Sequence, residues 1–150
     1  MLKDNKVSVM LRRVHDLPLR PEDDIDLPYK LPKLLHDAGI PFCLNNAGDM
    51  EAMGSRNLPF YAGTAAAYGL SKEQALQAVT LSTAQILGIG DRTGSLEEGK
   101  DATLFLSTGD ALDMRTNDVT HAFIEGRTVI LDDPQKFLYR KYKQKYEAEK

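Results

Sequence analysis

The side chains in this sequence that can bind a metal ion or transfer a proton are few and widely spaced. The three histidines are His15, His36 and His121. No two of them lie two or four positions apart, the spacings that direct two imidazoles at one metal ion from a strand or a helix. The chain alone therefore lacks the ligands for a metal site, and we expect it to hold none.

Two polar positions are candidates for substrate binding. His15 ends an apolar run over residues 6–14, and Arg56-Asn57 follows a second apolar run over residues 41–45. An arginine guanidinium binds an anionic group with two parallel hydrogen bonds, so Arg56 suits a substrate that carries such a group. The alternatives are a histidine that hydrogen-bonds the backbone of its own loop, and a surface arginine beside an asparagine that caps a helix.

The other reactive side chains favour structural roles. His36 lies inside a predicted helix, and His121 lies on the solvent face of a predicted strand. Cys43 lies inside a short apolar strand, where a buried and inert thiol is expected rather than a nucleophile. The sequence contains no serine nucleophile elbow, P-loop or dinucleotide fingerprint.

The elements that must position these side chains begin with a strand, a helix and a second strand. Residues 6–14 alternate apolar and polar positions, and residues 41–45 are a short apolar run, so both predict strands. Between them, Asp26 is a candidate N-cap, and Pro32 fits the helix only within its first turn. The apolar face of this helix is formed by Leu31, Leu34, Leu35 and Ala38. Short connections in a strand–helix–strand unit predict parallel pairing. A further small-residue helix is expected over residues 60–68.

Two helices with start signals come next. Ser71 with Gln74 and Ser82 with Gln85 each match a capping box, and Gly88 is the expected stop of the second helix. After these helices, strands are expected over residues 102–106 and in a hairpin formed by 119–124 and 128–131. The chain is thus expected to divide into an α/β segment over 1–90, a β-rich segment over 91–132 and a C-terminal helix over 133–150.

Length, charge and hydropathy exclude several classes of protein. The 150 residues carry a net charge of −3, which gives no electrostatic footprint for nucleic acid. No apolar run approaches the roughly 20 residues of a membrane span, so neither nucleic acid nor membrane is an expected partner. One cysteine excludes an internal disulfide and leaves the compartment open.

The stretch from residue 74 to residue 102 carries a family resemblance. QALQAVT (74–80) and AQILG (84–88), followed by GSLEEGKDA (94–102), resemble the C-terminal segment of the amidohydrolase superfamily, particularly imidazolonepropionase-like and related metal-dependent hydrolases. VTHAFIEGRTV (119–129) is similar to the closing hairpin of that family. The resemblance extends over residues 7–142.

This resemblance implies an α/β fold with the last two strand–helix units of a TIM-like (β/α)8 barrel, part of a small composite β-sandwich and a C-terminal helix. A complete barrel needs about 250 residues, so it also implies a C-terminal fragment of a longer enzyme. The intact enzyme would use a divalent metal, zinc by preference, held by upstream H-x-H ligands. Its implied partners are a small-molecule substrate and either the remainder of the chain or further copies of it.

The family places an aspartate directly after its last barrel strand. Asn45 and Asn46 occupy that place here, and a neutral amide cannot act as a general base. Asp49 is the nearest acid, so the resemblance implies that it is the catalytic carboxylate. The alternatives are a solvated loop acid and a lineage in which this function has changed.

Two hypotheses for function follow. In the first, the chain is part of an amidohydrolase-like hydrolase of amide or cyclic amide C–N bonds, inert without the upstream metal ligands. In the second, it is a free-standing, non-catalytic assembly module that uses an exposed sheet edge and the tyrosines of its tail. Whether the chain alone is an enzyme stays open.

Overall fold

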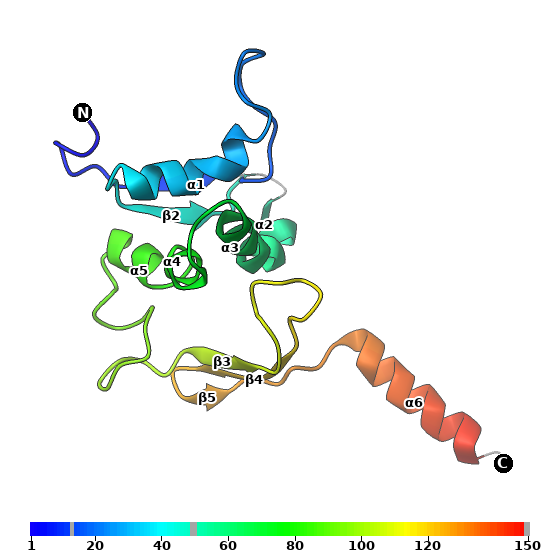
Figure 1. The fold of residues 1–150 in the computed structure, drawn as a ribbon. Helices are drawn as coiled ribbons and strands as arrows, with labels where there is room; N and C mark the ends of the chain where they lie inside the picture. The colour runs from blue at the N-terminus through cyan, green and yellow to red at the C-terminus, as the bar shows by residue number, and fades with distance from the viewer. Residues whose placement is uncertain (13, 49–50, 149–150) are drawn as a thin grey trace.

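The computed structural model describes residues 1–12, 14–48 and 51–148, which form a mixed α/β fold. Figure 1 shows an N-terminal part of helices around two strands, a small sheet beside it, and a last helix that projects away from both. The expected α/β class is therefore confirmed.

The N-terminal part is built on a parallel strand pair. β1 (Val9–Arg12) pairs in parallel with β2 (Phe42–Asn45), and α1 (Leu27–Asp37) connects them. The predicted strand–helix–strand unit and its parallel pairing are confirmed. The register aligns Arg12 with Asn45, so the carboxyl ends of both strands meet at one edge.

One expectation about α1 was wrong, and the N-cap position expected for Asp26 was confirmed. Pro32 lies in the helix interior rather than in its first turn, and the helix continues through it. The hydrogen bond lost there is to the carbonyl of Pro28 near the helix start, and the nearly complete burial of the Pro32 ring offsets that loss. Asp26 occupies the N-cap position, but its side chain makes no capping bond and instead pairs with Lys30 at 3.2 Å.

Three helices pack small residues against the strand pair. They are α3 (Leu58–Ala67), α4 (Lys72–Gln77) and α5 (Leu81–Ile86), and the segment α2 (Glu51–Gly54) with the 3-10 turn η1 (Ser55–Asn57) precedes them. The buried core combines large side chains from the strands with alanines from the helices. Its members are Val14, Leu35, Phe42, Leu44, Ala62, Ala65, Leu70, Ala75 and Ala78. The alanines let the helix backbones approach closely, as shown by the 2.9 Å bond from the Leu44 N–H to the Ala78 carbonyl.

The first predicted capping box is confirmed and the second was wrong. The Ser71 side chain accepts from the Gln74 N–H at 3.1 Å, and the Gln74 side chain accepts from the Ser71 N–H at 2.9 Å. Ser82 lies inside α5, because the chain turns at Thr80, which is the N-cap residue of that helix. Gly88 follows the end of α5 with φ +73°, the left-handed conformation expected of a glycine stop.

Ser71→Ala is expected to destabilise the chain by about 1 kcal/mol, because the Gln74 N–H at the start of α4 loses its acceptor. The measurement is urea unfolding followed by circular dichroism. Ser82→Ala is the matched control: this serine lies within a helix and caps nothing, so its removal should cost less than about 0.5 kcal/mol. Equal losses in the two variants would contradict the assignment of Ser71 as the cap.

The second sheet is antiparallel and follows the order β3-β4-β5. β3 is Leu104–Ser107, β4 is Val119–Ile124 and β5 is Arg127–Thr128, so the predicted strands are present, with β5 shorter than expected. The turn residues Glu125 and Gly126 both have positive φ, which is typical of a two-residue type I′ hairpin. The expected C-terminal helix is α6 (Pro134–Ala148). In the part of the chain described, no helix has the length and apolar character needed to cross a bilayer.

Candidate functional site

The candidate site lies where the two parallel strands end. Val14 is buried after β1 and anchors the chain there, and His15 follows it. After β2, the Asn46 side chain lies against Gly54: its amide nitrogen would be 3.2 Å from a Cβ at that glycine. Gly54 at the end of α2 therefore lies close to the end of β2, which is the edge where parallel α/β folds place ligands.

His15 is held by a hydrogen-bond chain to α3. Its Nε2 lies 2.6 Å from the Thr64 hydroxyl oxygen, and the Thr64 hydroxyl donates to the Phe60 carbonyl at 3.1 Å. A hydroxyl has one proton, so Thr64 must accept from His15. The His15 proton therefore resides on Nε2, and Nδ1 is the nitrogen that can take up a further proton.

The surroundings of His15 favour the neutral imidazole. Its ring meets those of Tyr61 and Tyr29 edge to face, with centroids 4.7 and 5.9 Å away. His15 remains partly exposed, and the partial desolvation of its ring lowers the pKa of His15 below its usual value. At neutral pH the residue is thus an uncharged hydrogen-bonding group, and its Nδ1 is available as a base.

An NMR titration of the His15 ring is expected to give a midpoint below that of histidine in an unstructured peptide. Because the pKa is lower in the folded chain, the unfolded chain binds more protons, and His15 lowers folding stability as the pH falls through the unfolded value. His15→Phe should reduce this loss of stability in urea unfolding between pH 5 and pH 7.5. A midpoint at or above the peptide value, or a proton on Nδ1 in the neutral form, would contradict this account.

His15 lines a cavity of about 490 Å³ between α3 and the loop over residues 110–117. The loop lies directly on α3: a Cβ at Gly63 would be 2.1 Å from the Leu112 carbonyl oxygen, so only glycine permits this contact. Ion pairs hold the loop, with Lys72 to Asp110 at 2.6 Å and Arg115 to Asp113 at 2.8 Å. The apolar residues that line the cavity include Phe60, Ala66, Ala67, Leu70, Leu112 and Met114.

The charges at this cavity are neutralised in pairs. Hydrogen bonds from the Arg115 side chain and backbone lower the pKa of Asp113 to about 2, so this carboxylate is ionised at any physiological pH. The Lys72 ammonium likewise lowers the pKa of Asp110. Among the described residues that line this cavity, His15 is thus the titratable group that is neutral at neutral pH, because its pKa is lowered while the carboxylates and cations are paired. Sequence reasoning missed the loop because nothing local to residues 110–117 indicates that they pack on α3.

The other predicted site residues do not join His15 at this cavity. Arg56 lies exposed in η1, and Asn57 is half-buried at the N-cap position of α3, where its side chain makes no capping bond. Neither lines the cavity that contains His15. Their expected role in substrate binding therefore stays a prediction. Asp49 lies outside the described residues.

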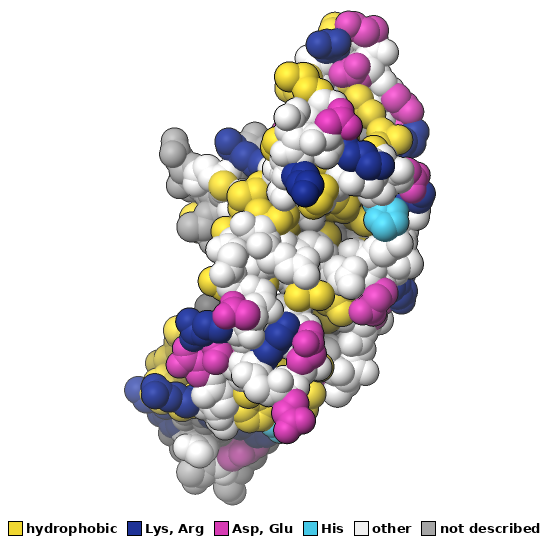
Figure 2. All heavy atoms as spheres, turned by 90° about the vertical axis from the view of Figure 1, so that its left-hand side faces the viewer, with side chains coloured by type: hydrophobic (Ala, Val, Ile, Leu, Met, Phe, Trp, Pro, Cys, Tyr) yellow, Lys and Arg dark blue, Asp and Glu magenta, His cyan; other side chains and the backbone are white. Residues whose placement is uncertain are grey.

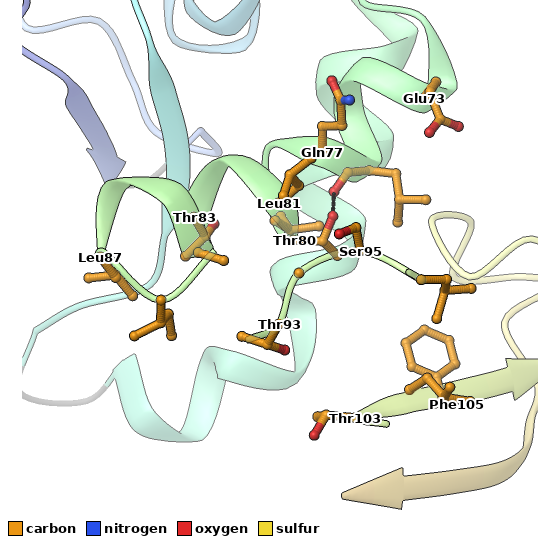
Figure 3. A pocket seen from close by; sticks show the side chains of 17 residues that line it. Glu73, Gln77, Thr80, Leu81, Thr83, Leu87, Thr93, Ser95, Thr103 and Phe105 are labelled. Atoms are coloured by element: carbon orange, nitrogen blue, oxygen red, sulfur yellow. Dashed lines mark hydrogen bonds between the residues drawn. The ribbon is translucent and has the colours of Figure 1, made fainter. Parts of the chain in front are cut away.

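A second cavity, of about 600 Å³, lies between the α4–α5 pair and β3. Figure 3 shows Thr80, Thr93, Ser95 and Phe105 around it, with Glu73 at its upper edge. Most of its lining is apolar, and the residues include Leu76, Leu81, Leu87, Ile89, Leu96 and Leu104. No pattern in the sequence predicts this cavity. A single carboxylate at its edge offers no acid–base pair, so this cavity suits apolar contacts rather than chemistry.

The described residues do not fit a divalent metal. Among them, no group of three or more His, Cys, Asp or Glu side chains is arranged to hold an ion. The ring neighbours of His15 are Tyr29 and Tyr61, and its hydrogen-bond partner is Thr64, none of which is a usual ligand for zinc.

Comparison with known proteins places the chain in a family. Residues 29–129, two thirds of the chain, match the model of the amidohydrolase family. The chain belongs to the amidohydrolase family. This confirms the resemblance seen at residues 74–102, and the matched range also contains most of α1, β2 and the β3–β5 sheet.

The chain spans a third or less of the length of the similar proteins that it matches. It is 34% identical over 84 residues to the imidazolonepropionase of Thermoplasma volcanium, a match over 55% of this chain and 20% of that protein. The imidazolonepropionase of Flavobacterium psychrophilum is 27% identical over 112 residues, 70% of this chain and 27% of its own length. The crystal structure of an amidohydrolase from Thermotoga maritima superposes on 86% of this chain and 33% of its own, with a TM-score of 0.70 and 30% identity.

Proposed function

We propose that this chain is the C-terminal part of an amidohydrolase-type hydrolase that cleaves amide or cyclic amide C–N bonds. The observation that carries the proposal is the family match over residues 29–129. The similar curated proteins named imidazolonepropionase support the bond type, because that name denotes an enzyme of a cyclic amide. The chain spans about a fifth to a third of the proteins it matches, so the rest of the catalytic machinery would lie elsewhere in the polypeptide.

Within this proposal, the β1–α1–β2 unit and α3 supply the last two strand–helix units of a barrel, and β3–β5 belong to a composite β-sandwich. The parallel register of β1 and β2 supports the first assignment, and the antiparallel β3–β5 sheet supports the second. His15 and the Asn46–Asn57 segment then lie on the face of the barrel that carries the active site. There His15 would orient the substrate, and Arg56 with Asn57 would bind an anionic group of it.

A divalent metal, zinc by preference, would activate the attacking water in the intact enzyme. The described residues do not supply its ligands, so we assign no step of the reaction to this chain through the metal. The proposal places the ligands on earlier strands of the polypeptide. Two roles in the reaction are then proposed for this chain. His15 positions the substrate, and Asp49, which lies outside the described residues, transfers a proton.

The test compares two polypeptides. One is residues 1–150 alone, and the other is expressed from the same reading frame extended upstream of the codon for Met1. Both are assayed with zinc on a cyclic amide and on a set of dipeptides. The proposal predicts zinc-dependent hydrolysis by the longer polypeptide and none by residues 1–150. Preceding sequence without an H-x-H pair, together with no hydrolysis by either polypeptide, would favour the free-standing assembly module instead.

A further inference from the structure

The last helix exposes an aromatic stripe that nothing in the described chain covers. α6 projects away from both sheets (Figure 1), and Phe137, Leu138, Tyr142 and Tyr146 are 45–60% exposed. At about 100° per residue, Leu138, Tyr142, Tyr146 and Tyr139 fall within an arc of roughly 100° on one side of the helix. Lys141 and Lys145 flank this stripe on one side, and Lys143 flanks it on the other.

Local bonds direct α6 away from the rest of the chain. The two terminal guanidinium nitrogens of Arg140 donate to the Asp132 carboxylate, at 3.1 and 2.5 Å. The Asp133 carboxylate accepts from the Lys136 N–H at 2.7 Å, which caps the helix start. An isolated helix of 15 residues is marginal in water, so a partner that covered the stripe would stabilise this one.

The charge of the tail is opposite to that of the rest of the molecule. Residues 134–150 hold six of the 19 Lys and Arg residues and two of the 22 Asp and Glu residues, a net charge of +4. The whole chain has a net charge of −3, so the remaining residues carry a net charge of −7. A second copy of this chain is thus a partner of complementary charge.

The acidic loop, residues 16–26 between β1 and α1, matches the stripe in both charge and apolar character. It carries five acidic residues and one arginine. Leu17, Leu19 and Ile25 in it are 72%, 99% and 68% exposed. Figure 1 places this loop at the opposite end of the molecule from α6, and Figure 2 shows acidic and apolar side chains together at that end. The two surfaces therefore do not meet within one copy.

We propose that two copies form a twofold dimer in which each α6 lies on the acidic loop of the other. The aromatic stripe then covers the exposed leucines and isoleucine, and the flanking lysines face Glu22 and Asp23. Because the loop begins at His15, the partner helix would border the candidate site. The inference concerns residues 1–150 as a separate chain, and its test measures association alone, so its failure can be told apart from a failure of the proposed hydrolase activity.

A charge exchange tests the dimer by sedimentation equilibrium. The loop variant is Glu22→Lys with Asp23→Lys, and the helix variant is Lys141→Glu with Lys145→Glu. Each alone places like charges in contact, so its dimer dissociation constant should rise about 100-fold. In an equimolar mixture both contacts are complementary again, and the two variants should form a heterodimer with nearly the original affinity. Leu138→Asp with Tyr142→Asp should give a monomer that no loop variant restores.

The control for net charge is Lys6→Glu with Arg127→Glu. It lowers the net charge by the same amount as the helix variant, at positions away from α6, and should leave the dimer intact. A monomeric original chain, or a mixture that stays monomeric, would overturn the proposal. Binding of a monomer to phosphatidylserine-containing vesicles by means of α6 would also overturn the proposal, because the basic helix would then serve a membrane surface. Circular dichroism of each variant confirms that it is folded.

Discussion

Leu44→Ala is expected to lower the free energy of unfolding by about 2–5 kcal/mol, the range for leucine to alanine in a well-packed core. Leu44 is 2% exposed in the middle of β2, and its backbone bonds the end of α4. The core cluster that contains Leu44 includes four alanines, whose short side chains cannot fill the space that the truncation leaves. Because β2 carries the segment from Asn46 to Asn57, the loss should also loosen the candidate site.

Leu96→Ala is the matched control for this prediction. Leu96 is 81% exposed, so the same change in side chain should alter stability by less than about 0.5 kcal/mol. Urea unfolding followed by circular dichroism measures both variants. Similar losses at the two positions would mean that β2 is not the centre of the folded core.

Asp49→Asn is expected to lower kcat/KM for amide hydrolysis by about 10²- to 10⁴-fold in the longer polypeptide, the usual contribution of a general acid or base. The expectation rests on the proposed function, in which Asp49 takes the place of the aspartate that follows the last barrel strand. Asp91→Asn, an exposed loop acid, is the matched control and should leave activity unchanged. Full activity of Asp49→Asn would indicate that the lineage has moved this function to another group.

Local signals in the sequence predicted the elements well, and tertiary contacts decided where those signals failed. The alternation in residues 6–14, the Ser71 capping box and the glycine turn at Gly126 each act within a few residues, and the structure contains all three elements. Ser82 has the same local pattern as Ser71, but α5 begins at Leu81, which puts Ser82 inside the helix. Pro32 is tolerated because the core buries its ring, which no local pattern reveals.

The candidate site was only partly predictable for the same reason. The end of β1 and the chemistry of imidazole pointed to His15. Its partner Thr64 lies 49 residues further along the chain. The loop that packs on Gly63 lies at a similar distance beyond Thr64. Such contacts depend on how helices pack on strands. Family resemblance predicted the superfamily from residues 74–102, none of which lines the cavity of His15.

The metal content of residues 1–150 tests the central claim most directly. The purified chain is dialysed against excess zinc and then against buffer, and bound metal is measured by mass spectrometry. The account predicts no stoichiometric zinc, because the proposed ligands lie on other strands of the polypeptide. Near-stoichiometric zinc would contradict it, since His15 and Asp49 would then belong to a metal site formed within this chain or between its copies.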